Sequence, residues 1–269
     1  MYLAQRVKDA VVDRLRGARG LRPSVDKEDP QLLLHAHLTG GRCTLLADAA
    51  GASLHKRGWR RFQGRAPLAE TTAAAAVLLS GWDRRSPLVD PFCGSGTLLV
   101  EAALLAAGVP PGSFRERFGF ERWPGHDARG FARLRAEARR PRTLPPKLVL
   151  AGCDADETAV AGALENVAAA GFGGRIDIER RSALDLDLKR GWGAWIVGNL
   201  PYGRRVGDAR DLPALYSGFG RLLCERCRGY HVALLTGDRA LARELGWEPA
   251  RRVAVANGAI PCELLVGEI

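Results

Sequence analysis

The chain has 269 residues, of which 46% are hydrophobic and 26% are charged, and its formal net charge is +10. This length allows one large α/β domain with a smaller attachment. No apolar run approaches the roughly 20 residues that cross a bilayer, and the N-terminus lacks a signal-peptide pattern, so we expect a soluble cytoplasmic protein with no membrane partner.

The positive charge is unevenly distributed. Residues 1–65 hold 13 Lys/Arg against 6 Asp/Glu, residues 113–146 hold 9 against 4, and residues 147–269 hold 16 of each. A polyanionic partner such as nucleic acid is one explanation, because neutralised phosphates give affinity that does not depend on sequence. A solvated basic surface is the alternative.

The first predicted elements are a helix and two strands. Residues 3–16 repeat an apolar residue at every fourth position, which is typical of an amphipathic helix. Residues 32–38 and 43–48 are predicted strands joined at Gly40-Gly41. These three elements are too little for an independent domain.

An alanine-rich helix is predicted next. The chain enters this helix through the stretch Arg65-Ala66-Pro67-Leu68-Ala69-Glu70-Thr71-Thr72. Propensity alone indicates a plain helix start, with Pro67 near the first turn.

A glycine-containing turn follows the apolar strand Pro87-Leu88-Val89 and precedes an apolar helix. Its sequence is Asp90-Pro91-Phe92-Cys93-Gly94-Ser95-Gly96-Thr97. Glycine in such a turn lets the backbone approach a ligand closely, because it adopts positive φ and has no side chain. The third glycine of the dinucleotide fingerprint is missing, which argues against NAD. Asp90 suits a cofactor that carries a cationic α-amino group and no phosphates.

An arginine-rich segment, residues 113–146, interrupts the strand order as an insertion. Its arginines alternate with aromatic residues, as the following positions show: Arg115, Arg117, Arg122, Arg139 and Arg140 with Phe114, Phe118, Phe120 and Trp123. Guanidinium groups beside aromatic rings suit contacts with phosphates and bases. Equally, the rings could serve only to pack the insertion.

A second strand-turn-helix unit is predicted around Asp154. The apolar run 148–153 ends at this residue, which is poised to accept both hydroxyls of a ribose. A helix then begins after Asp156 as N-cap, continues along an apolar stripe and stops at Gly171; the stripe is Val160, Ala163, Leu164 and Val167.

A third strand, residues 176–178, leads to Ser182-Ala183, and a fourth, residues 194–197, leads to Asn199-Leu200-Pro201-Tyr202-Gly203. Asn, Pro and Gly are turn formers, so this last motif alone would indicate a simple turn. Its position at the end of the fourth strand, after the glycine turn, instead indicates a functional motif. Together the two motifs predict methyl transfer from S-adenosylmethionine to an amino nitrogen.

The last strands complete a mainly parallel sheet with an antiparallel edge. One strand is predicted at residues 232–235, and two runs around Val253 and Leu264 are joined by the hairpin signal Asn257-Gly258. The fold class is therefore α/β and Rossmann-like. Six cysteines are present, and the single close pair, Cys224 and Cys227, is weak evidence for zinc, so no metal is assigned.

Three N-terminal stretches resemble the later part of a THUMP domain. They are Val7-Lys8-Asp9-Ala10, Ser24-Val25-Asp26-Lys27-Glu28-Asp29-Pro30 and Leu54-His55-Lys56-Arg57-Gly58-Trp59-Arg60. With the two motifs above, nearly the whole chain resembles THUMP-containing RNA guanine-N2 methyltransferases, above all the bacterial enzymes that act on large-subunit (23S) ribosomal RNA. The resemblance implies a class I methyltransferase domain at residues 63–269. It also implies a partial THUMP domain and linker at residues 1–62, without the N-terminal part that family members usually carry.

The resemblance also implies roles for individual residues. Asn199 and the Leu200 carbonyl would accept the two N–H groups of the guanine amine, Pro201 would fix φ, and Tyr202 would stack on the extruded base. S-adenosylmethionine would be held by a set that also includes Asn199: Pro67, Glu70, Thr71, Asp90, Phe92, Cys93, Gly94, Ser95, Gly96, Thr97, Asp154 and Ala183. Ser182 stands where many relatives have an adenine-contacting aspartate, with Asp185 shortly after.

Other functions compete with this one. A guanine-N2 methyltransferase acting on tRNA has a similar layout, although the linker His55-Lys56-Arg57-Gly58 favours ribosomal RNA. Adenine-N6 methylation uses a related Asn-Pro-Pro-Tyr motif, and Leu200 weakens that hypothesis. A non-catalytic RNA-binding remnant belongs to a different class and has no need for Asp90, Asp154 and Asn199 together. The sequence does not give the oligomeric state.

Overall fold

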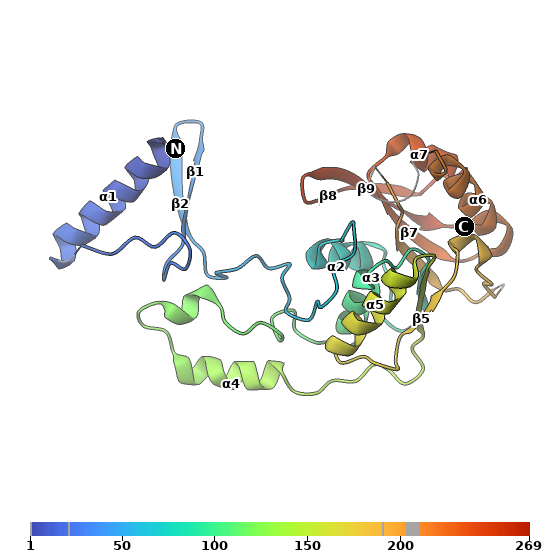
Figure 1. Cartoon of the computed structure of the whole chain (residues 1–269), viewed down its shortest axis with the longest axis horizontal. Helices are drawn as coiled ribbons and strands as arrows, with labels where there is room; N and C mark the ends of the chain where they lie inside the picture. Colours follow the sequence, from blue (N-terminus) through green and yellow to red (C-terminus); the bar gives the residue numbers. More distant parts are fainter. Residues whose placement is uncertain (1, 21, 190, 203–209) are drawn as a thin grey trace. The chain divides into compact units, whose positions relative to one another are not determined.

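The computed structural model describes residues 2–20, 22–189, 191–202 and 210–269, which form two compact units (Figure 1). Unit 1 comprises residues 1–54 and 115–136, and unit 2 comprises residues 55–114 and 137–269. The division predicted between residues 62 and 63, into a partial THUMP domain with its linker and a methyltransferase domain, stays a prediction.

Unit 1 contains the expected helix and hairpin. Its elements are α1 (Tyr2–Arg19), β1 (Leu34–Thr39), β2 (Arg42–Ala47), the short helix η1 (Gly119–Arg122) and most of α4 (Ala128–Ala138). β1 pairs antiparallel with β2, and Gly40 and Gly41 form the turn with φ of 56° and 75°. The helix and the hairpin predicted from the sequence are therefore confirmed.

Part of the arginine-rich segment belongs to unit 1 and packs there. The Arg115 guanidinium donates to the carbonyls of Ala50, Ala52 and Ser53 at 3.2, 2.8 and 3.0 Å. It also lies 5.1 Å from the centre of the Phe118 ring. Arg115 is only 6% exposed, so its charge serves internal packing in this structure.

Unit 2 is built on a sheet of seven strands in the order β5-β4-β3-β6-β7-β9-β8. The strands are β3 (Leu88–Asp90), β4 (Leu150–Asp154), β5 (Asp177–Arg180), β6 (Trp195–Asn199), β7 (His231–Thr236), β8 (Arg251–Asn257) and β9 (Ile260–Glu268). Strands β3 to β7 run parallel to one another, and β9 is antiparallel to both β7 and β8. The predicted parallel sheet with an antiparallel edge is confirmed.

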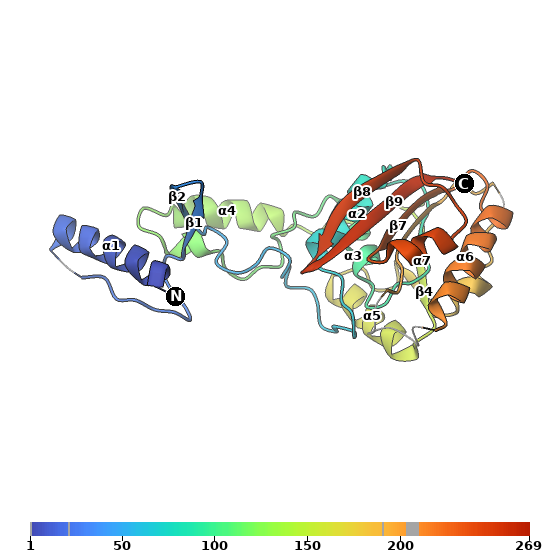
Figure 2. The ribbon, with the colours of Figure 1, turned by 90° about the horizontal axis from the view of Figure 1, so that it is seen from above.

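Helices cover both faces of this sheet (Figure 2). They are α2 (Glu70–Leu79), α3 (Thr97–Ala107), α5 (Glu157–Ala169), α6 (Leu212–Arg226), α7 (Arg239–Glu244) and the short helix η2 (Ala183–Asp185). Strand side chains alternate between the two apolar cores: Leu88 packs with α2, α3 and α5, whereas Val89 packs with α6 and α7. Both faces are therefore buried, as a parallel sheet requires.

One helix prediction needs correction. α2 begins at Glu70 with Ala69 as its N-cap, and Pro67 lies just before the first turn, as predicted. Leu164, predicted on the buried stripe of α5, is 45% exposed, and the fully buried polar residue of that helix is Asn166. The predicted caps of α5 are correct, since Asp156 accepts from the Thr158 amide and Gly171 has a φ of 84°. No helix in the described part of the chain is both long and apolar enough to cross a membrane.

Candidate active site

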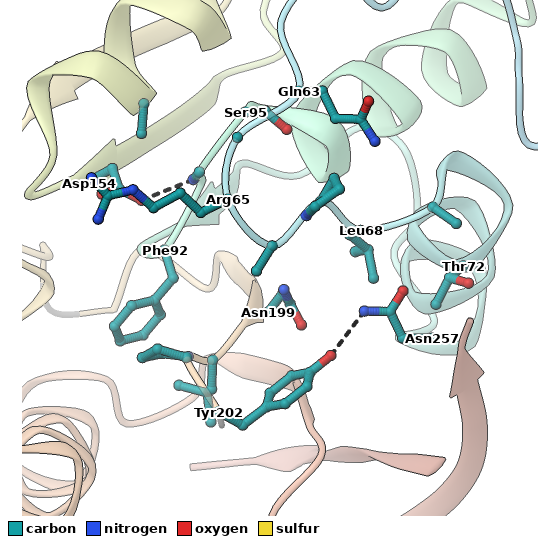
Figure 3. A pocket seen from close by; sticks show the side chains of 18 of the residues that line it. Gln63, Arg65, Leu68, Thr72, Phe92, Ser95, Asp154, Asn199, Tyr202 and Asn257 are labelled. Atoms are coloured by element: carbon teal, nitrogen blue, oxygen red, sulfur yellow. Dashed lines mark hydrogen bonds between the residues drawn. The ribbon is translucent and has the colours of Figure 1, made fainter. Parts of the chain in front are cut away.

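A cleft of about 1830 Å³ opens at the carboxyl ends of β3, β4 and β6 in unit 2 (Figure 3). β3 is the first strand of the sheet in the chain order, and its two neighbours, β4 and β6, follow on opposite sides. The order of the strands reverses at β3, and ligands of open α/β sheets bind at such a point.

The glycine turn between β3 and α3 forms one wall of the cleft. Gly94 and Gly96 have φ of 50° and 74°, a backbone conformation that favours glycine. A Cβ on Gly94 would meet no atom of the described residues within 4 Å, whereas one on Gly96 would lie 3.2 Å from the Ala163 Cβ. Gly94 therefore leaves room for a ligand, and Gly96 allows α5 to pack closely.

Asp90 is the strongest electrostatic feature of the site. Its side chain is buried, and Oδ1 accepts from the Phe92 amide at 3.1 Å, whereas Oδ2 has no hydrogen-bond partner among the described residues. Burial, and to a lesser extent the charge of Asp154, raises the pKa of Asp90 to about 8. A buried carboxylate with an unpartnered oxygen is costly, so this position fits a cationic ligand group.

Asp154 ends β4 and lines the same cleft. Its Oδ2 accepts from the Gly94 amide at 2.9 Å, and its Oδ1 accepts from the Asp156 amide at 3.0 Å. These bonds fix the carboxylate relative to the glycine turn. Each oxygen keeps further acceptor capacity, as the recognition of a ribose diol requires.

Asn199 ends β6 and lines the cleft beside Pro201 and Tyr202. Its Oδ1 is buried and has no hydrogen-bond partner within the described ranges. Leu200 is 1% exposed, and its amide donates to the Leu235 carbonyl at 2.9 Å, so the backbone after Asn199 is held by β7. Gly203, the last residue of the motif, lies outside the described residues.

The Tyr202 ring is held by the β8–β9 hairpin (Figure 3). Its hydroxyl accepts from Asn257 Nδ2 at 2.9 Å and from the Cys262 thiol at 3.5 Å. A Cβ on Gly237 would lie 2.7 Å from the ring, so this glycine permits the close contact. Burial, together with the Cys262 hydrogen bond, raises the pKa of Tyr202 to about 12, and the phenol is therefore neutral at physiological pH.

Segment 63–69, together with the first turn of α2, forms another wall of the cleft. Pro67, Glu70 and Thr71 all line the cleft, and their role in holding the cofactor stays a prediction. The Glu70 carboxylate also pairs with Arg60, at 2.9 Å from Nε.

The remaining predicted residues occupy different parts of the site. Phe92, Ser95 and Ala183 line the large cleft, and Ser182 accepts from the Leu184 amide at 3.2 Å as the cap of η2. Cys93 and Thr97 line a small adjoining cavity together with Asp90 and Asn199. Gly96 lines neither space in the described part of the chain, and its contact with Ala163 is a packing contact.

The comparison with known proteins agrees with this geometry. Residues 57–265 match the family described as RMKL-like, methyltransferase domain, and residues 1–48 match the THUMP domain. The first match covers more than half of the chain and contains every predicted site residue. The chain belongs to the RMKL-like methyltransferase family.

Two relatives are similar to this chain along nearly its whole length. A ribosomal RNA large subunit methyltransferase K/L of Methylococcus capsulatus is 43% identical over 100% of the chain, and one of Pseudomonas entomophila is 39% identical over 99%. The chain spans only 37% and 38% of the lengths of these two relatives. Among solved structures, the methyltransferase candidate SMU.472 in complex with SAH has a TM-score of 0.83 and 29% identity, covering 97% of this chain and 68% of that one.

The RMKL-like domain also uses residues that sequence reasoning missed. Arg60 and Asn166 bond to the glycine turn, and Asn257 and Cys262 hold Tyr202. The Asn257-Gly258 pair gave a signal for a turn but none for a contact with the site. The described residues contain no group of three or more His, Cys, Asp or Glu that could hold a metal ion.

Proposed function

We propose that this chain transfers a methyl group from S-adenosylmethionine to the exocyclic N2 amine of a guanosine in 23S ribosomal RNA. One observation carries the proposal. Two buried oxygens, Asp90 Oδ2 and Asn199 Oδ1, lack partners among the described residues and border the same small cavity. One is suited to a cationic amine, and the other to the N–H of an incoming nucleophile.

The side chains that line the cleft suit S-adenosylmethionine. Asp90 would bind the α-amino group, and Asp154 would accept the ribose hydroxyls. Pro67, Glu70 and Thr71 would cover the methionine end, and the glycine turn would approach it with backbone atoms. Phe92 and Ala183 offer apolar surface of the kind that packs on a purine. SMU.472, which resembles this chain in fold and sequence, is described as bound to SAH.

The chemistry follows from where hydrogen-bond acceptors lie. The guanine amine is a weak nucleophile because its lone pair is delocalised into the ring. Asn199 Oδ1 and the Leu200 carbonyl would accept its two N–H groups and leave the lone pair free to attack. When bound, the cofactor supplies a methyl group on a sulfonium centre, which is already activated. Orientation is then the main contribution of the protein, and no general base is assigned.

Base and RNA recognition complete the proposal. Tyr202 offers a ring, fixed by Asn257 and Cys262, on which the extruded base would stack. The basic N-terminal region, residues 1–62, would contribute RNA contacts as a partial THUMP domain. The K/L name of the relatives favours ribosomal RNA over tRNA. Ribosomal RNA is made in the cytoplasm of bacteria, and we place the protein there.

Two measurements on the purified chain test this function. Calorimetric titration with SAH should give binding that Asp90→Ala abolishes. Incubation with labelled S-adenosylmethionine and in-vitro transcribed 23S ribosomal RNA should yield N2-methylguanosine by nucleoside mass spectrometry, whereas a tRNA pool should not. Asn199→Ala should keep SAH binding and lose methyl transfer. A folded wild-type chain that does not bind SAH would refute the proposal and favour an RNA-binding remnant, and labelling of tRNA alone would favour the alternative substrate.

A further inference from the structure

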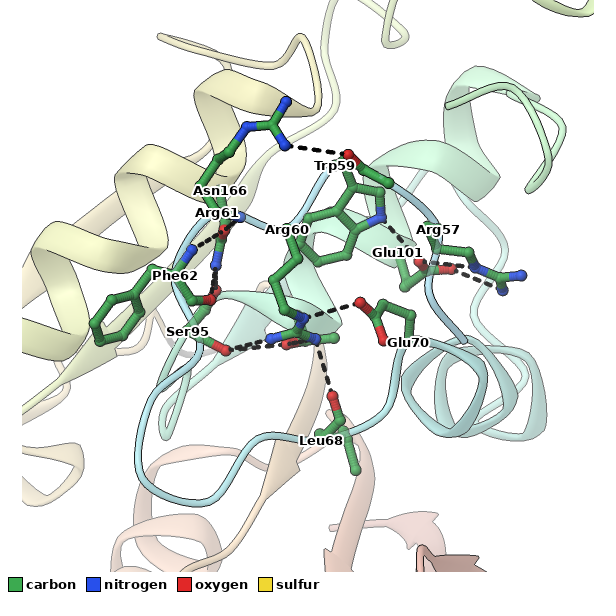
Figure 4. A network of polar contacts seen from close by, with 12 residues as sticks. Arg57, Trp59, Arg60, Arg61, Phe62, Leu68, Glu70, Ser95, Glu101 and Asn166 are labelled. Carbon is green, nitrogen blue, oxygen red and sulfur yellow. Dashed lines mark hydrogen bonds and ion pairs between the residues drawn. The ribbon is translucent and has the colours of Figure 1, made fainter. Parts of the chain in front are cut away.

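The linker that enters unit 2 is fastened to the methyltransferase core at three points (Figure 4). The Arg57 guanidinium and the Trp59 indole donate to Glu101 of α3. Arg60 reaches the glycine turn and α2. The amides of Arg61 and Phe62 donate to Asn166 Oδ1 at 2.6 and 2.9 Å. Immediately after these anchors, the chain runs along the cleft as segment 63–69.

Arg60 joins the two walls of the small cavity next to the cleft. On the side of segment 63–69 and α2, its Nη2 donates to the Leu68 carbonyl at 3.0 Å and its Nε to Glu70 at 2.9 Å. On the side of the glycine turn, Nη1 donates to Ser95 Oγ at 3.0 Å and Nη2 to Thr97 Oγ1 at 2.9 Å. One planar side chain thus fixes the spacing between the two walls.

The cavity between these walls is the part of the site that holds the unpartnered Asp90 carboxylate. It is lined by Ala66 and Leu68 from one wall, by Gly94, Ser95 and Thr97 from the other, and also by Asp90. A ligand that enters this cavity therefore contacts both walls. A change in their separation would alter its fit without changing any group that touches it.

Asn166 fixes the start of segment 63–69 in the same way. Its Nδ2 donates to the carbonyls of Phe62 and Ser95, both at 2.9 Å, so one amide ties the linker to the glycine turn. A Cβ on Gly162 would lie 2.0 Å from the Phe62 ring, so the ring packs directly on α5. Segment 63–69 is therefore held at its start by Asn166 and at its end by Arg60.

We propose that Arg60 is a positioning residue for the cofactor. By bonding Leu68 and Glu70 on one wall and Ser95 and Thr97 on the other, it sets the width of the cavity that receives the amino-acid end of S-adenosylmethionine. This inference rests on the proposed function. Arg60 also lines the large cleft. Its proposed role is to position the two walls, because all four of these hydrogen-bond partners are protein groups. The rigid fork of a guanidinium meets them together, whereas the single ammonium of lysine cannot.

The alternative is that Arg60 only stabilises the fold, as any satisfied buried arginine does. Arg57 provides a matched control for that case. It lies three residues earlier in the same linker, its side chain is 11% exposed against 14% for Arg60, and it also pairs with a buried carboxylate, Glu101. Arg57 and Glu101 lie outside the lining of both the cleft and the small cavity in the described part of the chain.

The test compares Arg60→Lys with Arg57→Lys in the full chain. Calorimetry with SAH and thermal unfolding are measured for both variants and for the wild type. We expect both variants to be less stable than the wild type, but only Arg60→Lys to bind SAH more weakly. Its Kd should rise by about tenfold, which is the size of effect expected when one hydrogen bond is lost. Equal SAH affinities of wild type and Arg60→Lys, or equal weakening in both variants, would overturn the positioning role.

A second variant covers the case in which Arg60→Lys does not fold. Thr97→Val keeps the side-chain shape and removes one of the four bonds of Arg60. Limited trypsin digestion then reports on the segment, because Arg65 lies exposed within it. Thr97→Val should be cleaved faster at Arg65 than the wild type at equal global stability, and an unchanged rate would contradict the proposal. A wild type that binds no SAH would refute the proposed function and, with it, this inference.

Discussion

The Tyr216 hydroxyl donates to the carbonyl of Pro201 at 3.0 Å. Tyr216 lies on α6 with no exposed surface, and its hydroxyl also lies 3.1 Å from Thr236 Oγ1 at the end of β7. The backbone directly after Asn199 and Leu200 is thereby tied to α6. The Tyr216 ring lies outside the lining of the cleft, so within the described residues this contact bears on the site only through the backbone.

We expect Tyr216→Phe to lower kcat for methyl transfer by roughly tenfold and to leave the Kd for SAH within about twofold. The substitution removes one oxygen and preserves the ring, so the Pro201 carbonyl loses its partner without loss of packing. Steady-state kinetics and SAH calorimetry on the same preparation would separate the two effects.

Tyr230→Phe is the control for this substitution. Tyr230 is equally buried, and its hydroxyl donates to the Lys189 carbonyl at 2.7 Å, away from the cleft. Both variants should lose a similar amount of stability, but Tyr230→Phe should keep full kcat. A Tyr216→Phe enzyme with wild-type kcat would show that the hydrogen bond to Pro201 is only structural.

Cofactor binding should release a proton from Asp90. The pKa of Asp90 is raised to about 8 by burial, so at pH 7 most of the molecules carry a neutral carboxyl. A cationic amino group binds the ionised form, and the proton must leave. The affinity for SAH should therefore rise from pH 6 to pH 8, by at most about tenfold per unit, and then level off.

Calorimetry at pH 7 in phosphate and in Tris would measure this proton directly. The two buffers differ in ionisation enthalpy, so the observed binding enthalpies should differ by most of that difference. Identical enthalpies in both buffers would mean that Asp90 is already ionised before binding.

The same carboxylate should limit the stability of the cofactor-free protein. The folded-state pKa of Asp90 lies above its ordinary value of 3.8. The side chain therefore contributes fully to the free energy of unfolding below pH 3.8, and this contribution is lost as the pH rises through about 8. Asp90→Asn stays neutral throughout. We therefore expect this variant to have a higher Tm than the wild type, with a gain that grows from pH 6 to pH 9.

With saturating SAH, the wild type should have a higher Tm than Asp90→Asn, because the ligand would bind and stabilise only the wild type. Thermal unfolding with and without SAH measures both effects. A gain in Tm that is the same at pH 6 and pH 9 would show that ionisation of Asp90 is not its cause.

The sequence was sufficient for the parts of the fold that depend on local pattern. Apolar runs and turn residues predicted the strands that end at Asp90, Asp154 and Asn199, because each run is bounded by its own turn signal. Parallel strands bring their carboxyl ends to one edge, so the two motifs could be placed in one site without knowledge of any contact.

The contacts that support the site depend on the folded chain. Arg57, Arg60 and Arg61 are close in the sequence, yet Arg57 is buried and Arg60 half-buried against carboxylates, whereas Arg61 is exposed. No periodicity distinguishes them in an irregular linker. Asn166 was missed for a related reason. The linker packs against α5 and supplies the backbone groups that satisfy the side-chain amide of Asn166, and no local pattern reveals that contact.

Two glycines of α6 allow the packing of that helix to be tested. A Cβ on Gly220 would lie 1.8 Å from the backbone carbonyl oxygen of Leu245, so the helix and the chain after α7 would have to separate. A Cβ on Gly218 would lie 3.1 Å from the end of the Leu184 side chain, which can rotate. We expect Gly220→Ala to destabilise the protein by at least about 2 kcal/mol, and Gly218→Ala to change its stability by less than about 1 kcal/mol, because the greater helix propensity of alanine offsets the milder contact. Urea unfolding of both variants measures the difference, and equal midpoints would mean that α6 and the Leu245 backbone are not in the close contact described.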